Sequence, residues 1–283
     1  MRAQIFRSSQ RNFDCKIIES GEIVVACALG NLLKGKETLV VGDFVQLECD
    51  DQREYKIIEV ESRKTEIFRM ITREKKKKVT AANCDLLVIL CSVAKPKFKR
   101  GIIDRFLVRA EQWNIPAVIV LNKMDKYNED DFDIIFEQDR LEKLGIEFFE
   151  ISAKTSDYKP RYLANGIVEL REILKDKTSI FLGQSGVGKS TLIGLLTDGK
   201  VNLKTNKIGK AGKGSHTTTW SEMIHCGSFQ MVDSPGIRSF SLDDLFLDEL
   251  DNYFPDLLPY FGKCKFSNCD HLEKSLGCVF YKD

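Results

Sequence analysis

The sequence lacks an excess of either charge and has no long hydrophobic run. Lys and Arg total 43 against 42 Asp and Glu among 283 residues, so the chain as a whole has no net attraction to nucleic acid. No apolar run is long enough to span a bilayer, and Met1 to Ser8 lack the apolar core of a signal peptide. We therefore expect a cytoplasmic protein without membrane association. Binding to nucleic acid would be local, for example at Lys75 to Lys78, where a solvated loop is the simpler interpretation.

The nine cysteines are not expected to form disulfides, because these bonds are rare in cytoplasmic proteins. Six cysteines are scattered and are most simply buried thiols. The other three lie with a histidine in the pattern Cys264-x4-Cys269-x-His271-x6-Cys278. Three thiolates and one imidazole suit a closed tetrahedral Zn²⁺ site, which is structural because no position is left for water. We expect one structural zinc ion; the alternative is a set of unpaired thiols beside a coincidental histidine.

The length predicts two or three domains. Residues 1–71 contain short apolar segments separated by Gly, Asn and Asp turns, which predict an OB-like β-barrel. These segments span 21–28, 39–41, 44–48 and 55–60. Residues 72–80 are polar and basic without an apolar period, and predict a linker. We expect an α/β domain over 81–238 and a small zinc-binding domain of helices and loops over 239–283.

Residues 81–238 alternate between apolar runs and amphipathic stretches. Continuous apolar runs such as Asp85 to Cys91 are typical of buried parallel strands. The predicted strands span 85–91, 116–121, 146–151, 178–182 and 229–232. The predicted helices span 102–113, 131–144, 166–174 and 191–196. This pattern predicts a three-layer α/β domain with a mainly parallel sheet. A further helix is expected to begin at Ser241-Leu242-Asp243-Asp244.

The most informative segment is Gly183-Gln184-Ser185-Gly186-Val187-Gly188-Lys189-Ser190-Thr191. It follows a predicted strand and precedes a predicted helix, as the phosphate-binding pattern G-x4-G-K-[ST] requires. Backbone N–H groups of the loop and the dipole of the helix favour an anion there. Lys189 would contact the terminal phosphates, and Ser190 would be a ligand of Mg²⁺. The alternative is an ordinary Gly-rich turn.

Asn122-Lys123-Met124-Asp125 follows another predicted strand, at the edge where open α/β sheets bind ligands. Guanine presents two adjacent donors, N1–H and the exocyclic amino group, which the carboxylate of Asp125 can accept. Adenine has no such pair and would leave a buried carboxylate unpaired. Asn122 and Lys123 would support the loop and flank the base. Ser152-Ala153-Lys154 indicates a second base-contacting loop. For both segments a capping turn is the alternative.

Asp233-Ser234-Pro235-Gly236 fits the pattern D-x-x-G, in which the Asp lies near Mg²⁺ and the Gly N–H contacts the γ-phosphate. A β-turn is the alternative. A Gly- and Lys-rich stretch before it ends in His216-Thr217-Thr218-Thr219, any of whose three hydroxyls could complete the Mg²⁺ shell. Ile237 stands where Ras-like proteins carry the glutamine that orients the attacking water, so His216 is the candidate catalytic replacement. A structural hydrogen-bonding role is the alternative for this histidine.

The base-binding segments precede the phosphate-binding segments, whereas an ordinary GTPase has the opposite order. Five elements in this order indicate a circular permutation, which a fold tolerates when the new termini lie at its surface. The segment after Asp233 then leads directly into the C-terminal region. We infer that the permutation couples the nucleotide state to that region.

The OB-like domain, the permuted GTPase domain with GQSGVGKST and the Cys/Cys/His/Cys segment together resemble the ribosome small-subunit-dependent GTPase A (RsgA) family. The resemblance covers essentially the whole chain. Ser215 departs from it where a basic residue is expected, and Ser234 replaces the more usual threonine. The family implies a GTPase that binds GTP and GDP, is stimulated by the small (30S) ribosomal subunit and assists its late maturation. It also implies that the two outer domains contact 16S rRNA; we expect a monomer.

Without the resemblance, the residues support only a GTP hydrolase with accessory domains. A competing interpretation is a nucleotide-gated RNA-binding module in which hydrolysis is incidental. A P-loop kinase of a small metabolite is disfavoured, because it would leave Asn122 to Asp125 and Asp233 to Gly236 without a role.

Overall fold

The computed structural model describes residues 1–9, 12–30, 38–71, 74, 76–155, 157–201, 203, 221–233 and 242–281. The chain divides into two compact units, residues 1–241 and 242–283. The finer domain limits expected from the sequence remain predictions.

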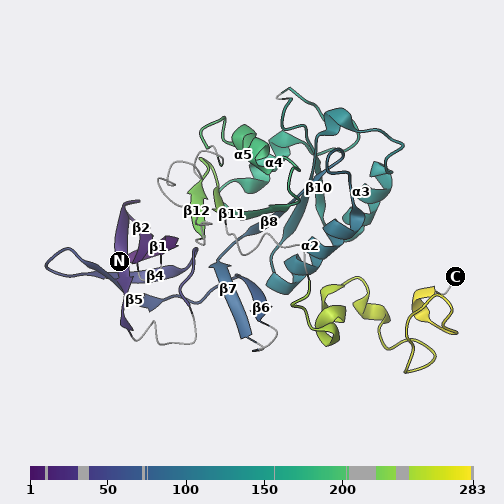
Figure 1. Cartoon of the computed structure of the whole chain (residues 1–283), viewed down its shortest axis with the longest axis horizontal. Helices are drawn as coiled ribbons and strands as arrows, with labels where there is room; N and C mark the ends of the chain where they lie inside the picture. Colours follow the sequence, from purple (N-terminus) through teal and green to yellow (C-terminus); the bar gives the residue numbers. More distant parts are fainter. Residues whose placement is uncertain are drawn as a thin grey trace, which may run out of the picture. The chain divides into compact units, whose positions relative to one another are not determined.

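Five N-terminal strands form a closed barrel (Figure 1). They are β1 (Arg2–Ser9), β2 (Asn12–Ile17), β3 (Ile23–Ala28), β4 (Phe44–Cys49) and β5 (Tyr55–Val60). The order is β1-β2-β3-β5-β4; β4 returns to pair with β1, and β3 and β5 run parallel. Ile5, Cys15 and Ile57 are fully buried inside it. The predicted OB-like barrel is confirmed, although segment 39–41 supplies a single bridge between Val41 and Ala81 instead of a strand.

The basic segment that we assigned to a linker belongs largely to a strand. β7 (Lys76–Ala82) pairs antiparallel with β6 (Glu66–Ile71). Lys76 to Lys78 are exposed, and only the end of the strand, at Ala81 and Ala82, is buried. The linker prediction is therefore wrong for residues 76–80. A strand with one polar, solvated end and one short buried end has no apolar period for sequence analysis to detect.

Six further strands form the sheet of the α/β region, in the order β10-β9-β8-β11-β13-β12. They are β8 (Leu86–Ser92), β9 (Ala117–Asn122), β10 (Glu147–Glu150), β11 (Thr178–Gly183), β12 (Glu222–His225) and β13 (Gln230–Asp233). The first five strands in this order run parallel to one another, and β12 is antiparallel to β13. Along β8, Leu87 and Ile89 face one core while Val88 and Leu90 face the other. Burial on both faces explains the continuous apolar runs.

Helices cover both faces of this sheet (Figure 1). α2 (Arg100–Trp113) and α3 (Ile134–Lys143) pack on one face, and α4 (Ile167–Leu174) and α5 (Lys189–Leu196) pack on the other. The three-layer prediction is confirmed. The central strand β11 follows β8, β9 and β10 in the chain, as a circular permutation requires.

The barrel is joined to the α/β sheet through β1 and β12, which pair antiparallel with Arg7 opposite Glu222. The guanidinium of Arg7 donates to Glu222 Oε2 at 2.9 Å and to Asp14 Oδ2 at 3.3 Å. The five barrel strands and the six strands of the α/β region therefore form one continuous hydrogen-bonded sheet, and β6 and β7 form a separate two-stranded sheet.

The C-terminal unit has little regular structure. Within residues 242–281 it contains three short 3₁₀ segments and no α-helix: η3 (Leu247–Tyr253), η4 (Leu258–Tyr260) and η5 (Val279–Tyr281). The helix predicted from Ser241 is therefore wrong over its described part, which begins as a turn and continues as η3. Pro255 follows η3 and Pro259 lies within η4, so the pieces of chain after Tyr253 are too short for α-helices.

Across both units, none of the helices in the described part of the chain is long and apolar enough to cross a membrane.

Candidate functional site

The phosphate-binding pattern forms the turn between β11 and α5. Gly188 precedes the first residue of α5 and has φ +103°, a left-handed conformation that side chains rarely adopt. A Cβ atom there would lie 2.4 Å from Nδ2 of Asn122, and one at Gly183 would lie 2.4 Å from the carbonyl oxygen of Leu90. The two glycines of the pattern therefore let this turn approach the neighbouring strands closely. Gln184, Ser185 and Val187 complete the turn, and Lys189, Ser190 and Thr191 form the first turn of α5.

Asn122, the last residue of β9, links three segments. Its side chain is 2% exposed, and Nδ2 donates to the carbonyl oxygen of Val187 at 2.8 Å. Its Oδ1 accepts the backbone N–H groups of Lys123 at 2.8 Å and Ala153 at 2.9 Å. One amide thus holds together the phosphate-binding turn and both predicted base-contacting loops.

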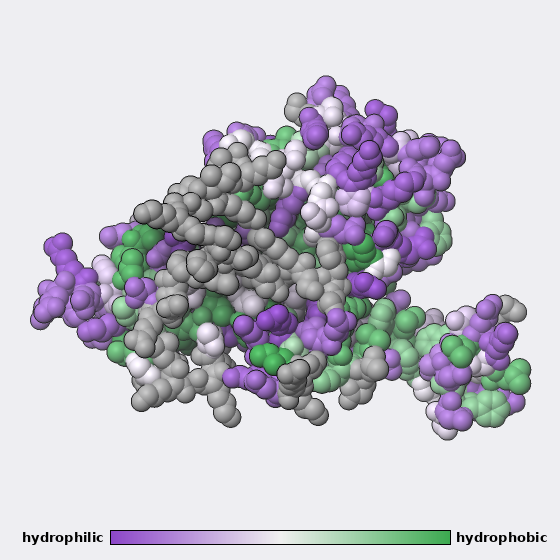
Figure 2. All heavy atoms as spheres, in the orientation of Figure 1, coloured by the Kyte–Doolittle hydropathy of each residue, from purple (hydrophilic) through white to green (hydrophobic). Residues whose placement is uncertain are grey.

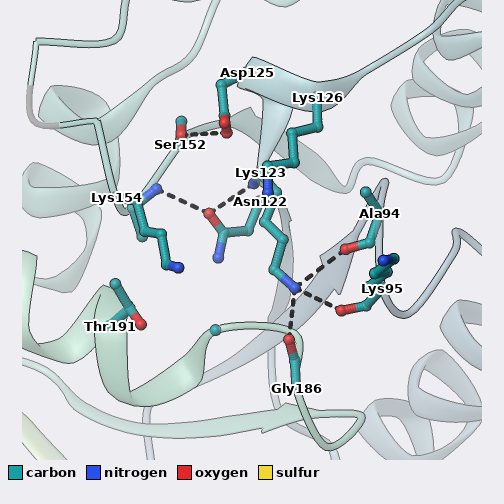
Figure 3. A pocket seen from close by; sticks show the side chains of 12 residues that line it. Ala94, Lys95, Asn122, Lys123, Asp125, Lys126, Ser152, Lys154, Gly186 and Thr191 are labelled. Atoms are coloured by element: carbon teal, nitrogen blue, oxygen red, sulfur yellow. Dashed lines mark hydrogen bonds between the residues drawn. The ribbon is translucent and has the colours of Figure 1, made fainter.

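The ammonium of Lys123 makes a second link to the same turn (Figure 3). Its Nζ donates to the carbonyl oxygens of Gly186 at 2.7 Å, Lys95 at 2.7 Å and Ala94 at 3.1 Å. Partial burial, together with the nearby charges of Lys126 and Lys154, lowers the pKa of Lys123. The carbonyls of Ala94 and Lys95, just after β8, were missed by the sequence analysis because backbone acceptors have no side-chain signature.

Asp125 lies beside Ser152, whose Oγ donates to Oδ1 of the carboxylate at 2.6 Å. The backbone N–H of Met124 donates to the carbonyl oxygen of Ile151 at 3.1 Å and joins the two loops. Ser152 is buried, but Asp125 is exposed. The sequence predicts a buried carboxylate, whereas the structure leaves Asp125 exposed; a bound base would have to cover it.

These segments surround a cavity of about 460 Å³ (Figure 3), within the roughly 300–1,000 Å³ range of small-molecule sites. The cavity is lined by Ala94, Lys95, Asn122, Lys123, Asp125, Lys126, Ser152, Ala153, Lys154, Gly186, Gly188 and Thr191. The structure thus brings the segments predicted to contact the base and the phosphates, which are far apart in sequence, to one cavity at the carboxyl ends of β8, β9, β10 and β11.

The remaining predicted residues divide into two groups. Asp233 ends β13, next to β11, and is partly buried at the same edge of the sheet. The predicted switch and catalytic residues lie outside the described residues; they are His216, Thr217, Thr218, Thr219 and Gly236. Ile237 also lies outside them.

The four predicted metal ligands of the C-terminal unit lie together. The ligand atoms of Cys264, Cys269, His271 and Cys278 are all within 4.8 Å of one another. Nδ1 of His271 is 3.5 Å from Sγ of Cys264 and 3.7 Å from Sγ of Cys278. Sulfur ligands at about 2.3 Å from a tetrahedral zinc ion are about 3.8 Å apart. The cluster is therefore compatible with one zinc ion.

Replacing Gly188 by alanine tests the role of the close approach between the turn and Asn122. The new Cβ would strain the left-handed backbone and displace the Asn122 amide. The turn would relax to another position, and nucleotide binding would have to restore the original one at a cost of about 3 kcal/mol. We expect the Kd for GDP, measured by calorimetry, to rise about a hundredfold in Gly188→Ala.

The matched control is Gly194→Ala in α5, where a Cβ meets no atom within 4 Å. This change should leave the Kd for GDP unaltered and stabilise the helix by up to about 1 kcal/mol. Wild-type affinity in Gly188→Ala would contradict the proposed geometry.

Comparison with known proteins gives consistent results. The family model described as RsgA GTPase matches residues 60–243. The Small ribosomal subunit biogenesis GTPase RsgA of Bacteroides fragilis is 36% identical over 272 residues, which are 93% of this chain and 84% of the relative. The protein of the same name from Chlorobaculum tepidum is 38% identical over 257 residues, 87% of this chain and 79% of the relative.

Two solved structures are similar over nearly the whole chain. YjeQ from Thermotoga maritima has a TM-score of 0.71 at 29% identity, and covers 96% of this chain and 87% of its own. YloQ, described as a circularly permuted GTPase, has a TM-score of 0.69 at 25% identity, and covers 98% of this chain and 85% of its own. The family model and the curated relatives, together with the permuted strand order of this chain, show that the chain is a member of the RsgA GTPase family.

Proposed function

We propose that this GTPase hydrolyses GTP on the small ribosomal subunit, assists the late maturation of that subunit, and is stimulated by it. The observation that carries the nucleotide part is the pair of links from Asn122 and Lys123 to the phosphate-binding turn, which place Asp125 and that turn at one cavity. The ribosomal part is supported by the relatives, which are named small ribosomal subunit biogenesis GTPases.

In the proposed site, Asp125 accepts the N1–H and amino group of guanine, and Ser152 orients its carboxylate. Lys154 and Ala153 border the base from the second loop. Lys189 contacts the β- and γ-phosphates, as the phosphate-binding pattern implies. Hydrolysis requires one water molecule aligned with the γ-phosphate; His216 is proposed to align it, because the side chain of Ile237 cannot form a hydrogen bond.

A Mg²⁺ ion bound with GTP would neutralise developing charge on the phosphates. Ser190 and Asp233 are proposed to hold it, together with one of Thr217, Thr218 and Thr219. The proposed location is the cytoplasm, the proposed state is a monomer without membrane association, and the proposed RNA partner is 16S rRNA.

We further propose that Cys264, Cys269, His271 and Cys278 hold one structural zinc ion. The C-terminal unit exposes apolar side chains (Figure 2). Among them are Leu272, which is 61% exposed, and Leu276, which is 84% exposed. A short unit that leaves several of its apolar residues in water, with 3₁₀ turns as its described helical structure, gains little from a hydrophobic core. Metal binding would supply the missing folding free energy.

The base specificity is tested by Asp125→Asn. An asparagine offers one acceptor and one donor, so its NH₂ opposes the amino group of guanine but pairs with the carbonyl at the same position of xanthine. We expect Asp125→Asn to bind GTP about a hundredfold more weakly than the wild-type protein does, and to bind XTP more tightly than the wild-type protein does. The affinities are measured by competition titration with a fluorescent nucleotide. Equal losses for both nucleotides would argue against a contact between Asp125 and the base.

The ribosomal role is tested by single-turnover GTP hydrolysis with and without purified small subunits. We expect at least a tenfold increase with small subunits, and none with large subunits as the matched control. A nucleotide-gated RNA-binding module predicts nucleotide-dependent association with the small subunit but an unchanged hydrolysis rate, so that result would overturn the enzymatic proposal.

Zinc binding is tested by counting reactive thiols by mass spectrometry after alkylation at neutral pH. Cys27 and Cys49 are exposed and should react in the metal-loaded protein. Burial raises the pKa of Cys15 and Cys91 to about 12 and that of Cys226 to about 11, so these thiols stay protonated and protected at neutral pH.

A chelator should then expose three more thiols, those of Cys264, Cys269 and Cys278, with release of one zinc ion per chain. Prior replacement of His271 by alanine should make the three thiols reactive without a chelator. If the three thiols react equally with and without chelator, and metal analysis finds no zinc, the metal proposal is wrong.

A further inference from the structure

Four aromatic residues connect the loops that carry the base-contacting segments. They are Phe98, Tyr127, Phe132 and Tyr162, and each is partly buried against the core on the α2–α3 face of the sheet. No residue of this aromatic cluster lines the cavity. The cluster instead contacts the loops whose residues line the cavity, so an effect on nucleotide binding would have to act through these loops.

Tyr127 is the centre of the cluster and directly follows the segment Asn122 to Lys126. It caps η1 (Met124–Lys126), and its backbone N–H donates to the carbonyl oxygen of Met124 at 3.2 Å. Its ring meets those of Phe132 and Tyr162 edge-on, with centroids 5.2 and 5.0 Å apart. Its hydroxyl donates to the carbonyl oxygen of Phe132 at 2.6 Å, closing the loop that begins two residues after Asp125.

Phe132 carries the connection to the loop after β8. Its ring stacks on that of Phe98, with centroids 4.1 Å apart and planes 14° apart. Lys97 adds an ion pair to Asp131 at 3.0 Å. Phe98 is three residues beyond Lys95, whose carbonyl oxygen accepts the ammonium of Lys123. The stack therefore ties this carbonyl-bearing loop to the loop that follows Asp125.

Tyr162 carries the connection to the second base-contacting loop. Its backbone N–H donates at 2.8 Å to Oε2 of Glu150, which is fully buried at the end of β10. The same carboxylate accepts the backbone N–H of Arg161 at 3.0 Å and of Leu163 at 2.9 Å. Glu150 stands two residues before Ser152, the partner of Asp125. The position of the Tyr162 ring is thus fixed from the strand that presents Ser152.

We propose that the aromatic cluster sets the position of the Asp125 carboxylate, and that Tyr127 is a positioning residue for the recognition of guanine. The inference rests on the proposed function, since it assumes that guanine nucleotides bind in the cavity. The loops after β8, β9 and β10 line the cavity. The cluster joins them on the side of the α2–α3 core, where Tyr127 contacts both the Phe98–Phe132 stack and Tyr162, whose backbone is held by the buried Glu150. Two oxygens of one carboxylate must meet two donors of the base, so a small rotation of the Asp125 loop weakens one bond before the other.

The test is the ratio of the Kd values for IDP and GDP, measured by calorimetry. Hypoxanthine keeps the N1–H but lacks the amino group, so this ratio reports the second hydrogen bond to Asp125. In Tyr127→Ala we expect GDP to bind about tenfold more weakly while IDP changes much less, so that the ratio falls at least threefold. Tyr127→Phe removes only the hydroxyl bond to Phe132; it should still fold and lower the ratio by about twofold.

The matched control is Phe229→Ala. Phe229 is 3% exposed and packs on Phe181 in the core on the opposite face of the sheet, with centroids 6.0 Å apart. Its loss should lower the melting temperature at least as much as Tyr127→Ala but leave the IDP/GDP ratio unchanged. A general loss of stability would change the IDP/GDP ratio equally in Phe229→Ala and Tyr127→Ala. A positioning role changes this ratio only in the Tyr127 variants.

An IDP/GDP ratio that stays at the wild-type value in both Tyr127 variants would overturn the inference while leaving the proposed function intact. A wild-type protein that binds GDP no more tightly than ADP would instead overturn the proposed function, and the inference with it. The two failures are distinguishable because the second is seen before any variant is made.

Discussion

The proposed nucleotide site depends on the hydrogen bonds that Asn122 and Lys123 make to the backbone of the phosphate-binding turn. These side chains come from the end of β9, and their acceptors, the carbonyls of Val187 and Gly186, lie more than 60 residues further along the chain. Because Nδ2 of Asn122 occupies the space of a side chain at position 188, that position must be glycine. These hydrogen bonds fix the proposed base-binding loop and the phosphate-binding turn to each other, and such preorganisation lowers the entropic cost of binding.

The same sheet joins this site to the rest of the chain. The parallel strands bring the carboxyl ends of β8, β9, β10 and β11 to one edge, so the permuted order of the segments does not change where they meet. Next to β11, β13 ends at Asp233 and pairs with β12. β12 in turn pairs with β1 of the barrel, where Arg7 lies opposite Glu222. The sheet is therefore continuous from the strands that carry the proposed base-binding loops to the barrel. Asp233, a proposed Mg²⁺ ligand, ends a strand between the two.

Much of this arrangement could be predicted from the sequence, because apolar runs mark strands buried on both faces, and the motifs stand at the strand ends. Features that depend on packing could not. The contacts of Lys123 with Ala94 and Lys95 use backbone carbonyls, which any residue has. β7 has a solvated basic end that resembles a linker in sequence. The exposure of Asp125 and the aromatic rings that meet around Tyr127 follow from loop conformations that have no periodic pattern.

The central claim is that Asn122, Lys123 and Asp125 combine with the phosphate-binding turn to form a single site for a guanine nucleotide. The most direct measurement is calorimetric titration of the wild-type protein with GDP and with ADP in the presence of Mg²⁺. The account predicts one GDP per chain, bound at least about a hundredfold more tightly than ADP, because adenine cannot supply the two donors that Asp125 accepts. Equal affinities for the two nucleotides would contradict it.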